Sequence, residues 1–266
     1  MTQKRDFEGL LTGRVIRPEM RGQDIDDDEA ASMTDKPLAI VTGVGPGTGS
    51  AIVRRFAGGG FRVIALARSP DRIRALEQEL PDTHAMICDV ANESEVTDAV
   101  ASIRKSHGAP DVLIHNAVGG GWGTFLEIDP KMLERNFRVN VMGLMYLARD
   151  VAPDMIKKGS GAILVTGNTS AIRGKANFAG FAPTKAAQRI LSESMARDLG
   201  PRGIHVAYVL IDAVIDVPRM RERLPDAPDE FFIKPSAIAD ELWHLYHQDR
   251  SAWSFLTELR PFAEKW

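Results

Sequence analysis

A glycine-rich turn at residues 43–49 is the first part of this chain whose residue types and spacing could do chemistry. The turn lies between an apolar run that predicts a strand and a segment that predicts a helix. Glycines let a backbone approach a pyrophosphate closely, and amide groups at a helix start then meet its charge. A tight turn without a ligand is the alternative, but the flanking strand and helix are the context that a dinucleotide site requires. The residues expected to bind the pyrophosphate of such a cofactor are Gly43, Gly45, Gly47, Thr48 and Gly49.

The end of the second predicted strand favours a phosphorylated cofactor. Ala67 stands where an acidic residue would receive the ribose hydroxyls of NAD, and Arg68 follows it. A guanidinium can pair with a 2′-phosphate and stack near the adenine. The pair predicts NADP(H) in preference to NAD(H). The alternatives are that Arg68 is an exposed loop residue, or that Arg72 or Arg74 shares its task.

Four motifs resemble the short-chain dehydrogenase/reductase superfamily, and the resemblance covers about residues 37–266. The spacing T-G-x-x-x-G-x-G over 42–49 is narrower than a generic glycine pattern. Asp89-Val90 resembles the adenine contact of that superfamily, and His115–Val118 partly matches its N-N-A-G motif. The segment Asn140–Gly143 resembles N-V-x-G.

This resemblance implies further contacts to the cofactor. The Asp89 carboxylate could accept a hydrogen bond from the exocyclic amine of the adenine, with a helix cap as the alternative. Lys185 could bind the nicotinamide ribose and hold positive charge near the reacting carbonyl. The cofactor residues that the resemblance adds are Asp89, Val90, Asn116, Ala117, Lys185 and Ile215.

Of the four catalytic positions that the resemblance assigns, two carry the residue usual in the superfamily. Asn140, which helps to hold a helix kink and a relay water in the superfamily, is present, as is Lys185. Asn168 stands at the place of the catalytic serine, and Phe181, four residues before Lys185, stands at the place of the tyrosine that protonates the substrate. Asn168 could still donate a hydrogen bond, whereas a phenyl ring has no proton to give. The F-x-x-x-K pattern resembles a divergent bacterial branch of the superfamily.

The source of a proton therefore stays open at this stage. Carbonyl reduction would need it from a bound water, from the substrate or from one of several side chains. An imidazole with a structural role is the plainer reading of His115. In the loop after the sixth strand, Asp212 or Asp216 could act as a base, although a helix cap is the favoured role. The candidate proton donors among the side chains are Thr169, Ser170, Thr184 and His115.

Two functions are compatible with these residues. One is an NADP(H)-dependent oxidoreductase with a non-standard active site, acting on a carbonyl, an alcohol or an activated alkene. A hydride transfer to an alkene or iminium depends less on the missing tyrosine than reduction of a ketone does. The other is a catalytically silent NADP-binding protein with a regulatory or structural role.

The elements that must position these residues alternate along the chain. This alternation predicts an α/β fold of the Rossmann type, a doubly wound and mainly seven-stranded parallel sheet with helices on both faces. Strands are expected at Leu38–Thr42, Arg62–Ala67, Ala85–Cys88, Val112–His115, Ala162–Thr166, His205–Ile211 and Ser254–Leu259. Helices are expected near Gly49–Ala57, Asp71–Glu79, Glu93–Ser106, Met132–Met155, Phe181–Leu199 and Ser236–His247.

Composition narrows the remaining possibilities. The 266 residues carry a net charge of −3, which gives no general attraction to nucleic acid or to anionic lipid. A single cysteine, no secretory leader and no apolar run of roughly 18 residues indicate a cytoplasmic protein with no membrane partner. We expect a small-molecule substrate of unknown identity, and no metal, because neither His84 with Cys88 nor His244 with His247 has enough companions. The resemblance implies a homodimer or homotetramer.

Residues 1–36 differ in character from the domain expected at 37–266. They are acidic around 23–29 and show no hydrophobic period. The segment is interpreted as a flexible extension. An arm that packs on another subunit, or an alternative start at Met33, would also fit.

Overall fold

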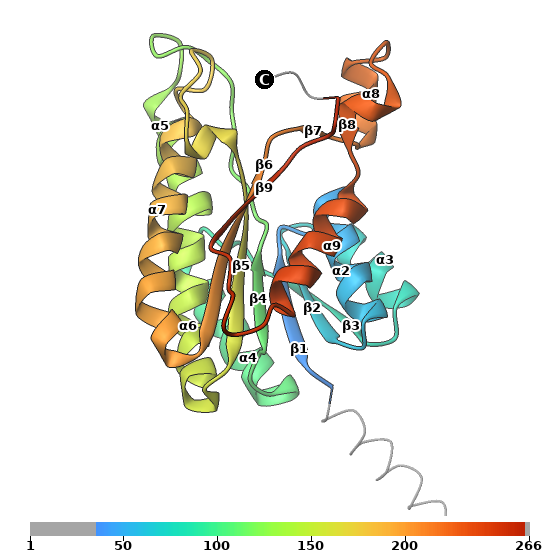
Figure 1. Ribbon diagram of the computed structural model, residues 1–266, viewed down its shortest axis with the longest axis vertical. Helices are drawn as coiled ribbons and strands as arrows, with labels where there is room; N and C mark the ends of the chain where they lie inside the picture. Colours follow the sequence, from blue (N-terminus) through green and yellow to red (C-terminus); the bar gives the residue numbers. More distant parts are fainter. Residues whose placement is uncertain (1–35, 264–266) are drawn as a thin grey trace, which may run out of the picture. The chain divides into compact units, whose positions relative to one another are not determined.

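The branched apolar runs form a parallel sheet, as the sequence predicts. The computed structural model describes residues 36–263. Seven strands pair in the order β3-β2-β1-β4-β5-β6-β9, and every pair is parallel (Figure 1). The strands are β1 (Leu38–Thr42), β2 (Arg62–Ala67), β3 (Thr83–Ile87), β4 (Val112–His115), β5 (Gly161–Asn168), β6 (Ile204–Ile211) and β9 (Leu256–Leu259).

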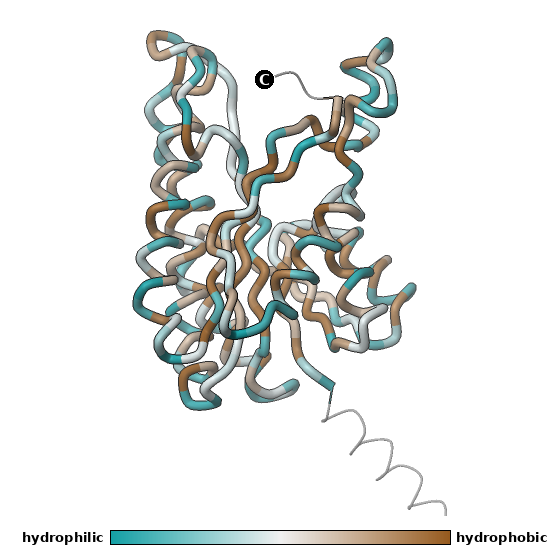
Figure 2. Tube along the Cα trace, viewed as in Figure 1, coloured by the Kyte–Doolittle hydropathy of each residue, from teal (hydrophilic) through white to brown (hydrophobic). Residues whose placement is uncertain are grey.

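Helices cover both faces of this sheet, which confirms the predicted Rossmann-type architecture. One layer buries Val96 and Leu144 against the sheet, and the other buries Ile52 and Leu242. Figure 2 shows hydrophobic residues along the central strands, between the two layers. The first layer contains α4 (Glu93–His107), α6 (Gly143–Lys158) and α7 (Ala182–Leu199), and the second contains α2 (Thr48–Gly58), α3 (Pro70–Glu79) and α9 (Pro235–Tyr246).

The helix expected at Met132–Met155 is interrupted. It consists of α5 (Pro130–Phe137), a π-helical turn at Arg138–Met142 and α6. A π turn inserts one residue into the helical ladder, and such turns often occur at functional sites. Here the side chain of Asn140, inside the turn, bonds to groups outside the helix.

Two short strands and several 3-10 turns were not predicted from the sequence. β7 (Val214–Ile215) and β8 (Phe232–Ile233) form a separate two-stranded sheet, with α8 (Pro218–Arg223) between them. Single 3-10 turns occupy Thr169–Ala171, Gly200–Arg202 and Asp229–Phe231. Residues 1–35, nearly all of the expected extension, lie outside the described residues. No helix within 36–263 is long and apolar enough to cross a bilayer.

The order of the strands fixes where a ligand can bind. β1 and β4 are neighbours, and the chain proceeds outward from them in opposite directions. In open α/β sheets, a crevice forms at the carboxyl ends of the strands at such a switch point. The glycine turn follows β1 directly, and Asn116 follows β4.

Candidate active site

The glycine turn has the shape that a pyrophosphate needs. Gly43 has φ +66°, and a Cβ there would lie 2.4 Å from the Cα of Ala117. A Cβ on Gly49 would lie 2.6 Å from the carbonyl oxygen of Gly43. Only glycine fits at these two positions, because the space excludes a side chain at both and the backbone conformation also disfavours one at Gly43.

The start of α2 offers unused hydrogen-bond donors to this turn. The helix is preceded by Gly47, and no side chain caps its first amide groups. The hydroxyl oxygen of Thr48 is buried and has no partner among residues 36–263. Free amides and an orphaned hydroxyl at a helix start suit a phosphate group. The residues present therefore fit the diphosphate of a dinucleotide.

Asn116 and Thr42 join the turn to the neighbouring strands. The Asn116 side chain donates from Nδ2 to the Gly43 carbonyl at 2.9 Å and accepts from the Thr166 hydroxyl at 3.0 Å. The Thr42 hydroxyl oxygen accepts from the backbone amides of Asn116 and Ala117, each at 3.3 Å. These bonds fix the carboxyl ends of β1, β4 and β5 relative to one another.

The opposite end of the crevice contains the residues predicted to recognise the adenosine. Ala67, Arg68, Asp89 and Val90 all line the same cleft, together with Arg72. The helix cap considered for Asp89 is wrong, because the side chain of Asn92 caps α4. The Asp89 carboxylate instead accepts from the Ala91 amide at 3.0 Å.

Lys185 and Asn140 lie in a buried network behind the cleft wall. The Lys185 ammonium donates to the Thr166 carbonyl at 3.1 Å and to Oε1 of Gln188. Gln188 in turn donates from Nε2 to the Asn140 carbonyl at 2.7 Å. Burial lowers the pKa of Lys185 to about 7. Sequence reasoning missed Gln188, although its position three residues after Lys185 puts both on one helix face.

Asn140 is a structural link in this network. Its Nδ2 donates to the Thr184 hydroxyl and to the Gly119 carbonyl, each at 2.8 Å, and its Oδ1 accepts from the Gly119 amide at 2.8 Å. The Thr184 hydroxyl donates to the carbonyl of Phe181 at 2.7 Å. The network therefore ends at the backbone of Phe181, the residue that the sequence predicts at the tyrosine position.

Phe181 and Asn168 both line the cleft, in contrast to Asn140 and Lys185. Oδ1 of Asn168 accepts from the Ser170 amide at 3.1 Å, so its amide NH₂ group stays available to a ligand. The Phe181 ring belongs to an aromatic wall that the sequence did not suggest. In this wall the ring centroids of Trp122 and Phe178 lie 4.5 Å apart, and those of Phe178 and Phe181 lie 6.4 Å apart.

Two of the four side chains considered as proton donors, Thr184 and His115, do not line the cleft. His115 is fully buried beside the Thr42 hydroxyl, and desolvation, followed by the charge of Lys185, lowers its pKa to about 3. Tyr208 is also fully buried, and burial raises the pKa of its hydroxyl. Of the candidates named from the sequence, only Thr169 and Ser170 line the cleft.

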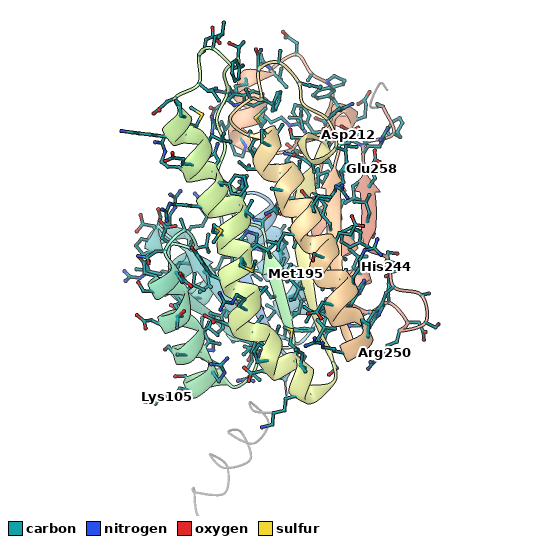
Figure 3. All side chains as sticks on the ribbon, turned by 90° about the vertical axis from the view of Figure 1, so that its left-hand side faces the viewer. Lys105, Met195, Asp212, His244, Arg250 and Glu258 are labelled. Carbon is teal, nitrogen blue, oxygen red and sulfur yellow. The ribbon has the colours of Figure 1, made fainter. Side chains whose placement is uncertain are left out.

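The two aspartates after β6 form ion pairs and do not cap a helix, so the predicted cap is wrong. Asp212 accepts from Arg173 at 3.1 Å and lies 3.4 Å from Arg260. Figure 3 shows Asp212 close to Glu258, which also pairs with Arg260. Asp216 accepts two hydrogen bonds from Arg221, which lower its pKa. α8 instead begins after Val217, without a side-chain cap.

These parts surround one elongated cleft with a volume of about 1230 Å³. It extends from Arg68 past the glycine turn to Trp122 and Phe231, and Ile215 lines it. Ligand pockets are commonly about 300–1,000 Å³, so this cleft has room for a cofactor and a second molecule. The shape, the switch-point location and the glycine turn are those of a nucleotide-dependent enzyme.

Comparison with known proteins decides the family. A model of the short chain dehydrogenase family matches residues 37–226. The chain is a short-chain dehydrogenase. This short-chain dehydrogenase is 31% identical to 7alpha-hydroxysteroid dehydrogenase of Escherichia coli K12 over 185 residues, which cover 68% of this chain and 72% of that protein.

Two further relatives bear on the cofactor. Carbonyl reductase [NADPH] 2 of Sus scrofa is 30% identical over 174 residues, which cover 64% of this chain and 69% of that one. A metagenomic short-chain oxidoreductase, solved in complex with NADP, superposes with a TM-score of 0.75 at 25% identity, over 87% of this chain and 100% of the other. The short-chain dehydrogenase fold binds a nicotinamide cofactor, and the relatives named here are oxidoreductases.

Proposed function

We propose that this short-chain dehydrogenase is an NADP(H)-dependent oxidoreductase that transfers a hydride without a tyrosine acid. The observation that carries the cofactor choice is the end of β2, where Ala67 leaves no carboxylate for NAD ribose hydroxyls and Arg68 lines the cleft. Gly43, Gly45, Gly47, Thr48 and Gly49 would hold the diphosphate. Asp89, Val90, Asn116, Ala117 and Ile215 would complete the cofactor site.

The test of this choice is a fluorescence titration of the full chain with NADPH and with NADH. We expect tighter binding of NADPH, because a guanidinium gains a charge-assisted bond only to the 2′-phosphate. Equal affinities for the two cofactors would overturn the proposal.

The bound cofactor would supply the hydride. A carbonyl must gain a proton at its oxygen as the hydride arrives, and Phe181 has none to give. The hydroxyls of Thr169 and Ser170 can donate hydrogen bonds, but they release protons poorly without an adjacent base. A conjugated alkene accepts the hydride at carbon and takes its proton from water, which supports an activated alkene as substrate. Asn168 would orient the substrate carbonyl by donating a hydrogen bond from its amide.

A silent NADP-binding protein is the second candidate, and the network of Lys185 favours it. The ammonium group bonds to Thr166 and Gln188 and does not line the cleft. Tight NADPH binding without NADPH oxidation on enones, enoates or ketones would favour this role. We further propose that the protein is cytoplasmic and forms a homodimer or homotetramer, which light scattering would measure.

A further inference from the structure

At the end opposite the adenosine side, the cleft is bounded by an apolar wall that residues 36–263 leave uncovered. Trp122 is 63% exposed although its ring packs edge-on against Phe178. Phe181, Met220 and Phe231 line the same end. Large exposed aromatic surface next to a cleft is typical of a ligand-binding site. The wall suits the flat apolar body of a substrate.

Positively charged side chains outnumber acidic ones in the lining at this end of the cleft. Arg173, Lys175 and Arg219 line the cleft, whereas Asp212 is the only acidic residue among 36–263 that lines it outside the adenosine side. Asp212 already pairs with Arg173 at 3.1 Å and with Arg260. Neither Lys175 nor Arg219 has a carboxylate partner within residues 36–263. Two positive charges therefore remain uncompensated by that stretch of the chain.

Arg221, two residues after Arg219, does have carboxylate partners, so the lack of one distinguishes Arg219 from its neighbour. On the same helix, Arg221 pairs with Asp216 at 2.7 Å and with Asp229 at 2.6 Å, and its guanidinium lies over the Phe232 ring. Arg221 is absent from the cleft lining, and Arg219 belongs to it. Asp216 and Asp229 therefore pair with the arginine that does not line the cleft.

Lys175 and Arg219 approach the cleft from two different parts of the chain. Lys175 belongs to the connection between β5 and α7, in a turn closed by a hydrogen bond from the Phe178 amide to its carbonyl at 2.9 Å. Arg219 belongs to α8, on the opposite side of the mouth (Figure 1). α8 begins next to the glycine turn, since a Cβ on Gly47 would lie 2.5 Å from the Val217 side chain. Lys175 therefore lies in the same turn as Phe178 of the aromatic wall, and Arg219 follows by two residues the valine that contacts the glycine turn.

We infer that the substrate is an anion with a planar apolar body, whose carboxylate or similar group is held by Lys175 with Arg219 opposite. The inference rests on the proposed function and names its substrate class. An aromatic wall alone would also accept a cation through its ring faces. The two uncompensated positive charges oppose a cation, which excludes the iminium class and leaves an anionic conjugated alkene.

The experiment measures quenching of Trp122 fluorescence in the full chain saturated with NADP⁺. The probes are two matched pairs of flat compounds, cinnamate with cinnamamide and 2-naphthoate with 2-naphthamide. We expect the carboxylates to bind about tenfold more tightly than the amides, in line with one charge-assisted hydrogen bond. Lys175→Gln removes this preference, whereas Arg223→Gln, a matched change on α8 outside the cleft, keeps it. Loss of the quenching signal in Trp122→Phe assigns it to this site.

Two results would overturn the inference. One is equal affinity for acid and amide in both pairs, and the other is an equal loss for both in Lys175→Gln. A third measurement separates the two anions that Arg219 could meet. If Arg219→Gln weakens NADP⁺ in calorimetry and leaves the carboxylates unchanged, Arg219 serves the cofactor diphosphate and its part in the inference fails. Failure of NADP⁺ to bind at all would instead contradict the proposed function.

Discussion

The side-chain amide of Gln188 accepts a hydrogen bond from the ammonium group of Lys185, one helical turn earlier on α7. The same amide donates to the Asn140 carbonyl at 2.7 Å, so a side chain fills the space between the ammonium and that carbonyl. An amide passes on a hydrogen bond, but it does not exchange protons as a water molecule or hydroxyl does. The ammonium group of Lys185 is thereby held by Gln188 and Thr166, behind the cleft wall to which Phe181 belongs.

The first prediction concerns the contribution of this network to stability. Gln188→Leu leaves a buried ammonium without one acceptor, which costs about 1–3 kcal/mol of unfolding free energy. Urea denaturation followed by circular dichroism measures the loss. Gln78→Leu, at an exposed position on α3, is the matched control and should change stability little. A similar midpoint for both variants would show that Gln188 does not support Lys185.

The second prediction is a dependence of stability on pH. Burial lowers the pKa of Lys185 from 10.5 in its ordinary state to about 7 in the folded chain. Between these values the unfolded chain binds the extra proton, so stability gained through Lys185 rises from about pH 7 towards pH 10.5. From about pH 7 to 10.5 the unfolding free energy of the wild type should rise relative to that of Lys185→Met. Lys105→Met, at an exposed position, is the control, and its unfolding free energy should change with pH as that of the wild type does. Parallel curves for all three proteins would disprove the shift.

The third prediction restores the missing acid. Phe181→Tyr combined with Asn168→Ser should create or raise NADPH-dependent reduction of generic ketones, because a hydroxyl then lines the cleft beside a serine. NADPH oxidation at 340 nm is the readout. Phe178→Tyr adds a hydroxyl to the neighbouring ring and should not raise the rate. If wild type already reduces ketones and the double change abolishes this, the chain has an acid of its own.

The fourth prediction assigns the phosphate contact. Arg68→Gln should weaken NADP⁺ binding about tenfold or more and leave NAD⁺ nearly unchanged, because only the phosphorylated cofactor loses a charge-assisted bond. Isothermal calorimetry gives both affinities. Arg74→Gln is the control, since Arg74 lies on the adjacent helix and does not line the cleft. An equal loss for both cofactors would assign Arg68 to the adenine or the ribose.

The sequence was sufficient for the fold because its signals are local. β1, β2 and β4 begin and end at the residues expected from their branched apolar runs. β7 and β8 were missed because they are too short to show a period. The helix kink at Asn140 was implied by the resemblance and not by the helical pattern, because its cause is tertiary, the bonding of Asn140 to Gly119 and Thr184.

The candidate site likewise has parts that the sequence predicts and parts that it does not. The glycine turn and the replacements at Asn168 and Phe181 are visible in the sequence, since each depends on spacing along one segment. The aromatic wall and the unmatched charge of Lys175 are not visible, because they arise where separate loops meet at one end of the sheet. The pairing of Asp212 with Arg260 likewise joins the ends of β6 and β9.

That last pairing orders the assembly of the site during synthesis on a ribosome. The glycine turn belongs to the first strand and helix of the described region, whereas Arg260 follows β9 and is translated more than two hundred residues later. Helix α2 gains its full apolar cover only when α9 has been made, since Phe56 packs edge-on against Trp243 with ring centroids 5.3 Å apart. Asp212 gains its second arginine only when β9 has docked on β6, so the substrate half matures last.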